Sequence, residues 1–69
     1  MRTINLSDKE KKIIRYICRQ YTAKEIGEKM GFTHRTIEDY KRKIQIKLRV
    51  RNSVGIALYA VKSGIFPLK

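Results

Sequence analysis

Apolar residues recur along this chain every three or four positions, which is the spacing of a helix that buries one face. The first such stretch covers about residues 8–19, and its apolar face consists of Ile13, Ile14, Ile17 and Cys18. It follows a tail, residues 1–6, and begins with Ser7-Asp8-Lys9-Glu10, the capping box of a helix N-terminus. The pattern predicts a helix over about 8–19, in which Glu10 is structural and Cys18 is a buried thiol.

A second capping box, formed by Thr22 and Glu25, precedes a shorter stretch over residues 23–30. The apolar residues of this stretch are Ile26 and Met30. Gly27 weakens a helix by about 1 kcal/mol relative to Ala, so we expect its missing side chain to let another helix approach closely.

The longest stretch covers residues 34–48 and follows a turn signal. Gly31 permits the left-handed backbone of a tight turn, and Thr33 is a good N-cap. At about 100° per residue, one side of this helix is apolar and holds Ile37, Tyr40, Ile44 and Leu48. The opposite side is polar and holds Arg35, Glu38, Asp39 and Arg42. A short helix, a turn containing Gly and a second helix with an exposed polar face make a helix-turn-helix.

The last stretch covers about residues 54–63, is capped by Asn52 or Ser53, and is ended by Gly64. One of its sides faces the core with Ile56, Tyr59 and Ala60. A second apolar stripe consists of Val54, Leu58 and Val61. A four-helix chain of this size cannot bury both sides of its last helix, so the second stripe indicates a partner surface.

Charge narrows the choice of partner. The 69 residues carry a net charge of +11. All six acids precede Tyr40, whereas eight Lys or Arg residues and no acid follow it. Self-repulsion on this scale destabilises the compact state, and a polyanionic partner removes it. Nucleic acid is the favoured partner, ahead of an anionic membrane surface.

The same sequence argues against several classes of function. It holds one Cys, and its one His, His34, has no companion at metal-ligand spacing, so we expect neither a disulfide nor a metal site. No nucleophile–base pair or phosphate-binding Gly loop is present, and we expect neither enzymatic activity nor a cofactor. No apolar run approaches the roughly 20 residues that span a bilayer, so we expect a cytoplasmic protein without membrane association.

Several short motifs stand in a fixed order along the chain. They are Leu6-Ser7-x-x-Glu10, Lys24-Glu25-Ile26, Phe32-Thr33-x-x-Thr36-Ile37, Lys47-Leu48-x-Val50-Arg51-Asn52, and Ala60 with Gly64. Together they closely resemble the LuxR-type helix-turn-helix domain, which is found at the C-terminus of many bacterial response regulators and quorum-sensing activators. The resemblance covers Leu6 to about Phe66, almost the whole chain.

The resemblance implies one all-α domain over residues 1–69, with the third helix as recognition helix and the fourth as dimerisation helix. Carried over to this chain, the base-reading positions are Glu38, Asp39 and Arg42. The phosphate contacts are Thr22, Lys24, Thr36 and Lys41, to which we add the cations Arg35 and Lys43. The dimer interface is expected at the second apolar stripe of the last helix, Val54, Leu58 and Val61.

Some residues depart from the pattern of this family. Many relatives have Lys where Glu38 stands and a small or apolar residue or Asn at Asp39. Carboxylates there favour cytosine N4, whereas Arg42 favours guanine O6 and N7. Most relatives have Gly in place of Arg49, so this corner either carries about 1–2 kcal/mol of strain or takes a different turn. Ile46, at a usually polar position, is either simply exposed or lies over a thymine methyl group or the sugar–phosphate wall.

The sequence therefore predicts sequence-specific binding of double-stranded DNA by a bacterial transcription regulator, the effector domain of a two-component response regulator. The domain would bind DNA as a homodimer, and the resemblance implies RNA polymerase and an upstream receiver or sensor domain as further partners. Two alternatives stay open. One is the promoter-reading C-terminal domain of sigma factors, which places its reading helix near its end. The other is a basic module that docks on an acidic protein or membrane surface, with its cations along one helix.

Overall fold

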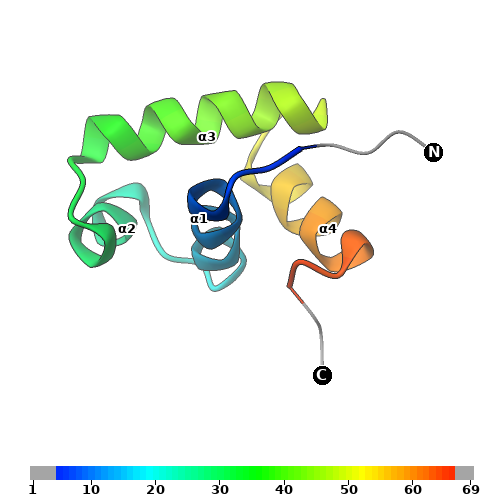
Figure 1. The fold of residues 1–69 in the computed structure, drawn as a ribbon, viewed down its shortest axis with the longest axis horizontal. Helices are drawn as coiled ribbons and strands as arrows, with labels where there is room; N and C mark the ends of the chain where they lie inside the picture. The colour runs from blue at the N-terminus through cyan, green and yellow to red at the C-terminus, as the bar shows by residue number, and fades with distance from the viewer. Residues whose placement is uncertain (1–4, 67–69) are drawn as a thin grey trace.

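The computed structural model describes residues 5–66, and these form four helices and no strand (Figure 1). The helices are α1 (Asp8–Cys18), α2 (Ala23–Met30), α3 (His34–Leu48) and α4 (Ser53–Ser63). The predicted second and third helices are confirmed, whereas α1 ends and α4 begins one residue earlier than expected. Asn52 is the N-cap of α4, and its side-chain oxygen accepts a hydrogen bond from the Gly55 amide at 3.1 Å. The all-α fold class is confirmed.

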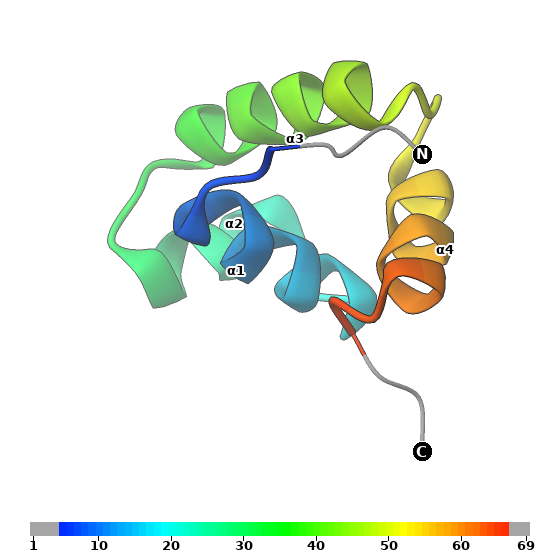
Figure 2. The same ribbon diagram turned by 45° about the vertical axis from the view of Figure 1, so that its right-hand side comes forward.

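α3 lies across the other three helices. Figure 1 shows it along the top, with α1 seen end-on beneath its middle, α2 beneath its N-terminal end and α4 beneath its C-terminal end. α1 packs on both α3 and α4, and α2 packs on α3 (Figure 2). One long side of α3 therefore rests on the body of the protein, while the other side is free. Within residues 5–66, no helix is long and apolar enough to cross a membrane.

Isoleucines form the centre of the core. Those that are almost wholly buried are Ile13, Ile14, Ile26, Ile37, Ile44 and Ile56. Burying a side chain of this size contributes about 1.5–3 kcal/mol, so the predicted apolar faces are the main stabilising elements. Cys18 is half-buried rather than buried, and burial still raises the pKa of its thiol. The thiol therefore stays protonated at neutral pH, in keeping with a structural role.

Both predicted capping boxes are present. The Ser7 amide donates to Glu10 Oε1 at 2.9 Å, and the Glu10 amide donates to Ser7 Oγ at 3.1 Å. Thr22 and Glu25 make the same exchange at 2.8 and 3.2 Å. The hydrogen bonds from Thr22 lower the pKa of Glu25. Each box satisfies two amides at a helix N-terminus and so fixes where α1 and α2 begin.

Gly27 makes room for a turn rather than for a helix, which corrects the expectation from sequence. A Cβ atom at this position would lie 2.5 Å from the carbonyl oxygen of Phe32. The Phe32 amide in turn donates to the Gly27 carbonyl at 2.8 Å. The missing side chain therefore lets the chain between α2 and α3 fold back closely on α2, and this sets how the helix-turn-helix bends.

The corner after α3 is left-handed. Arg49 has φ 57° and ψ 42°, and its amide donates to carbonyl oxygens of the last turn of α3. Of the two possibilities left open by the sequence, the strained corner is the one observed. A side chain in this conformation costs about 1–2 kcal/mol relative to Gly. Gln20, at the end of α1, has a similar φ of 66°, which the sequence did not predict.

Candidate nucleic-acid interface

The free side of α3 carries the three residues expected to read bases. Glu38, Asp39 and Arg42 are all exposed. Ile37 and Ile44, on the opposite side of the same helix, are wholly buried. Rotation of α3 about its axis would expose these isoleucines and bury the charges, so the core fixes which side of the helix faces solvent.

A shallow hollow of about 380 Å³ lies on this side of α3 and is lined by Glu38, Lys41, Arg42 and Gln45. Two of the three predicted base-reading residues, Glu38 and Arg42, therefore meet in one place, one helical turn apart. Asp39 does not line the hollow. The hollow offers both a carboxylate acceptor and a guanidinium donor to a polar ligand.

Glu38 is already paired on its own helix. Its carboxylate lies 3.4 Å from His34 Nε2 and 4.0 Å from Lys41 Nζ, and its side chain is 49% exposed. Exposed pairs at this spacing are worth only about 0.3–0.5 kcal/mol each. The neighbouring Lys41 therefore reduces the repulsion that Glu38 would exert on an approaching anion, without holding the carboxylate firmly in place.

The six predicted phosphate contacts are spread over two helices. Thr22 is the N-cap of α2 and Lys24 is exposed in its first turn, while Arg35, Thr36, Lys41 and Lys43 lie on α3. Thr22 is exposed, and its Oγ1 accepts a hydrogen bond from the Glu25 amide. Arg35 and Lys43 are exposed, whereas Thr36 is half-buried.

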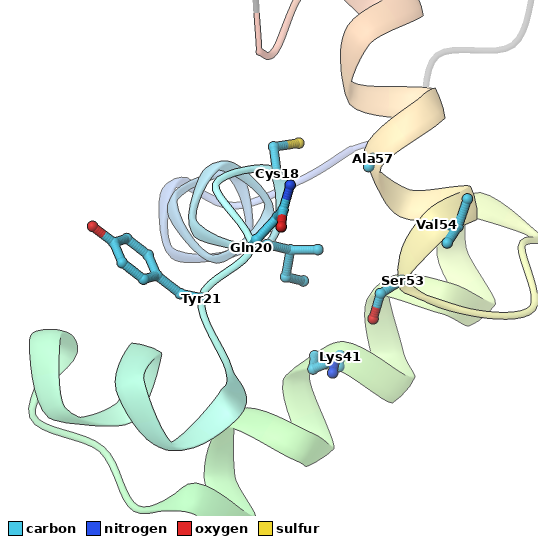
Figure 3. A pocket seen from close by; sticks show the side chains of 8 residues that line it. Cys18, Gln20, Tyr21, Lys41, Ser53, Val54 and Ala57 are labelled. Carbon is cyan, nitrogen blue, oxygen red and sulfur yellow. The ribbon is translucent and has the colours of Figure 1, made fainter.

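Lys41 is more enclosed than its sequence neighbours, with 22% of its side chain exposed. It lines the α3 hollow and also a second cavity of about 420 Å³, between the end of α1, α3 and the start of α4 (Figure 3). The lysine stem is therefore partly packed, and its ammonium group lies 4.0 Å from the Glu38 carboxylate. Cys18 and Val54 line the same cavity.

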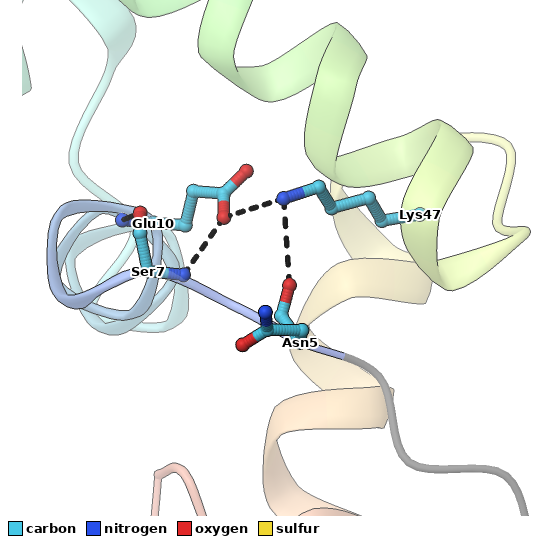
Figure 4. Close-up of polar contacts among 4 residues, drawn as sticks. All are labelled: Asn5, Ser7, Glu10 and Lys47. Carbon is cyan, nitrogen blue, oxygen red and sulfur yellow. Dashed lines mark hydrogen bonds and ion pairs between the residues drawn. The ribbon is translucent and has the colours of Figure 1, made fainter.

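An ion pair anchors α3 to α1. Lys47 Nζ lies 2.8 Å from Glu10 Oε1 and donates to the Asn5 carbonyl at 3.4 Å (Figure 4). Glu10 is only 4% exposed. Burial alone would raise the pKa of its carboxyl group, but hydrogen bonds from Lys47 and Ser7 and the lysine charge hold that pKa below its ordinary value. The pair fixes the C-terminal half of α3, and with it the tilt of the polar face.

The predicted dimer stripe is partly exposed. Val54 and Leu58 on α4 are 66% and 57% exposed, whereas Val61 is half-buried. The core takes Ile56 and Ala60 from the other side of α4, as expected. The exposed part of the stripe is therefore not needed to complete the core among the described residues.

Comparison with protein families decides the class of protein. Residues 4–60, well over half of the chain, match the family described as bacterial regulatory proteins, luxR family. The chain belongs to the LuxR family. The resemblance found in the sequence is thereby confirmed, and with it the DNA-binding helix-turn-helix formed by α2 and α3. The family is one of regulatory proteins rather than of enzymes.

One relative of this LuxR-family chain is the probable transcriptional regulator ycf29 of Guillardia theta. The two are 41% identical over 56 residues, which is 81% of this chain but 27% of the relative. The chain therefore spans about a quarter of the length of that relative.

Sequence reasoning missed two contacts of this LuxR-type domain. The pairing of Glu38 with His34 and Lys41 has a signal in the sequence, because residues three and four apart on a helix are neighbours. The pairing of Glu10 with Lys47 joins residues 37 apart, and no local pattern indicates it. Ile46 on α3 is 71% exposed, more than Val54 (66%) or Leu58 (57%) on α4.

Proposed function

We propose that this LuxR-family domain binds specific sequences of double-stranded DNA through the free side of α3 and thereby regulates transcription. The observation that carries the proposal is the hollow in which Arg42 and Glu38 lie one turn apart, on a helix whose opposite side is locked into the core. An α-helix fits the major groove of DNA, where each base pair presents a distinct pattern of donors and acceptors.

Base readout would divide between opposite charges. The Arg42 guanidinium is suited to guanine O6 and N7, and the carboxylates of Glu38 and Asp39 are suited to cytosine N4. The weak pairs that Glu38 makes with His34 and Lys41 are easily exchanged for a base. The two acids also weaken phosphate binding, which the surrounding cations offset.

Contacts with phosphates would come from both helices of the helix-turn-helix. The proposed residues are Thr22, Lys24, Arg35, Thr36, Lys41 and Lys43. Such contacts set the register and orientation of the protein on the duplex but do not read sequence. Because these residues lie on both α2 and α3, we expect the domain to contact the DNA backbone at two separate places, one at each helix.

We also propose that two copies bind DNA together through the exposed stripe of α4, Val54, Leu58 and Val61. A stripe of three residues is far smaller than a standard interface of about 1,600 Å². The free domain is therefore expected to be monomeric or weakly dimeric and to pair mainly on DNA. A two-fold pair would place its α3 helices in successive major grooves, so the site would be an inverted repeat with half-sites about 34 Å apart.

The wider context of the domain is a further part of the proposal. The name of the ycf29 relative and the quarter of its length that this chain spans support a role as the effector part of a longer regulator. A receiver or sensor domain upstream, as in two-component response regulators, and RNA polymerase as a target would complete that role.

Selection of bound sequences from random duplex DNA tests the proposal. The expected result is an enriched inverted repeat whose half-sites contain guanine and cytosine. Anionic lipid vesicles at the same salt concentration serve as the comparison, since a basic module that docks on membranes would bind them as well as DNA. Binding to vesicles without enrichment of any DNA sequence would contradict the proposal.

A further inference from the structure

α1 carries a line of cations on the side that faces away from α3. Lys12, Arg15 and Arg19 are all exposed. At about 100° per residue they lie roughly 140–200° around α1 from Glu10, the residue that is bonded to Lys47 of α3. Figures 1 and 2 both show α3 on one side of α1 and no helix on the side of α1 opposite to α3.

These three charges are not neutralised within the part of the chain that the structure describes. The ion pairs formed among residues 5–66 include none of Lys12, Arg15 and Arg19. Asp8 lies on the same side of α1, but at its N-terminal end, one turn before Lys12. The C-terminal two turns of this side are therefore purely cationic.

DNA bound to α3 does not account for this line of cations. Packed helix axes are about 8–10 Å apart and each helix is about 10–12 Å wide, so the outer side of α1 lies about 20 Å from the outer side of α3. At physiological salt the Debye length is about 8 Å. Charges at this distance add little to the affinity for a duplex on α3, and a second anionic partner is the simpler explanation for them.

The two arginines are held over an apolar segment. Arg15 Nε donates to the Ile65 carbonyl at 3.4 Å, and the Arg19 guanidinium lies 5.8 Å from the centre of the Phe66 ring. Ile65 and Phe66 are half-buried, and the Phe66 amide donates to the Ala60 carbonyl at 3.1 Å. Arginines beside aromatic and apolar groups are the composition that is enriched in protein–protein interfaces.

We propose that this surface, defined by Lys12, Arg15, Arg19, Ile65 and Phe66, binds an acidic surface of another protein while α3 holds DNA. The positive charges supply complementarity, and the half-buried apolar pair supplies a contact that a sugar–phosphate backbone does not match. A membrane surface would need an apolar side chain to insert. Among residues 5–66, the large hydrophobic residues that are exposed, Ile46, Val54 and Leu58, lie on α3 and α4 instead.

An NMR titration tests the proposal directly, with short poly-L-glutamate as the acidic probe and the domain saturated with its DNA site. The expected result is a shift of the amide signals of residues 12–19 and 65–66, while those of α3 stay at their DNA-bound positions. The variant K12S/R15S/R19S is expected to bind the probe about tenfold more weakly. It should keep its affinity for the DNA site within about twofold, because the removed charges are screened from the duplex.

Two further variants separate charge from structure. The Lys12 side chain makes no hydrogen bond or ion pair among the described residues, so Lys12→Glu reverses one charge without loosening the segment 64–66 and should also weaken binding of the probe. The matched control K9S/K29S removes exposed lysines outside this surface and should bind the probe as the parent does. Shifts confined to α3, or equal binding by the triple variant and the parent, would overturn the proposal. The proposal would also be overturned if these residues bound a second DNA duplex more tightly than poly-L-glutamate. Failure of the domain to select a DNA site, in contrast, would count only against the proposed function.

Discussion

At the scale of single residues, one carboxylate joins three parts of the protein. Glu10 caps α1 through Ser7 and binds Lys47 of α3, which in turn reaches the Asn5 carbonyl. The pKa of Glu10 is held below its ordinary value. The stabilisation from the charged carboxylate is therefore complete above the pKa of the unfolded chain and is lost as the pH falls through the lower pKa of the folded state.

The first prediction concerns this pair. In Lys47→Met, Glu10 stays buried without its cation, so the free energy of unfolding at neutral pH should fall by about 1–3 kcal/mol. The loss should shrink as the solution is acidified, because the carboxyl group then becomes neutral. Urea denaturation between neutral and acidic pH measures both effects. Lys43→Met, at an exposed lysine one turn earlier on α3, is the control and should change little. An equal loss at every pH would show that Lys47 acts through packing alone.

At the scale of elements, the corner between α3 and α4 predicts a stabilising substitution. Arg49→Gly relieves about 1–2 kcal/mol of left-handed strain in the folded state. It also makes the unfolded chain more flexible, which costs the folded state roughly 0.5–1 kcal/mol. The free energy of unfolding is thus expected to rise by up to about 1 kcal/mol in denaturant titrations. Arg51→Gly is the matched control, since Arg51 is not among the residues with positive φ, and it should be destabilising. A loss of stability in Arg49→Gly would contradict the assigned backbone.

Helix starts were predictable from sequence, but close approaches between elements were not. Ser7, Thr22 and Thr33 cap helices through residues three positions away, so the signal is local. The glycine at position 27 predicted a close contact with another element. The atom that lies close to Gly27 is the carbonyl oxygen of Phe32, and its position depends on how the turn folds. The contact between Glu10 and Lys47 depends on how α1 and α3 pack against each other. The spacing of hydrophobic residues along each helix does not determine that packing.

At the scale of the whole molecule, the polar face of α3 was predictable because a helix that buries Ile37 and Ile44 must expose Glu38 and Arg42. The net charge of +11 predicted an anionic partner, but not that cations would lie on opposite sides of the protein. That division depends on the way α1 sits beneath α3, and it appears only in the three-dimensional arrangement.

Charge also predicts how binding responds to salt. The logarithm of the DNA affinity should fall linearly with the logarithm of the salt concentration, by about 0.9 per phosphate neutralised. Lys41→Ala should weaken binding to all duplexes alike and reduce that slope by about one unit. Fluorescence anisotropy over a salt series measures the slope, and Lys29→Ala on α2 is the control. An affinity for duplex DNA that does not change with salt would contradict the electrostatic part of the proposal.

Assembly on DNA is tested by one charge in the apolar stripe of α4. Leu58 is 57% exposed, so Leu58→Asp should leave the helical circular dichroism signal unchanged. The same change places two carboxylates face to face across the proposed two-fold axis, and it should abolish two-to-one binding to an inverted repeat. Gel shifts and footprinting report the stoichiometry, and Lys62→Asp, an exposed change later on α4, controls for the added charge. Cooperative binding by Leu58→Asp would rule out this stripe as the interface.

The central claim is that the free side of α3 reads DNA sequence, and the most direct test compares Arg42→Ala with the parent on two duplexes. On the selected site the variant should lose about 1–3 kcal/mol of binding free energy, because a bidentate contact to a base is removed. On a scrambled duplex of equal length and at the same salt concentration, the loss should be much smaller. Equal losses on both duplexes, with the parental sequence preference retained, would show that Arg42 contacts only the backbone and would contradict the claim.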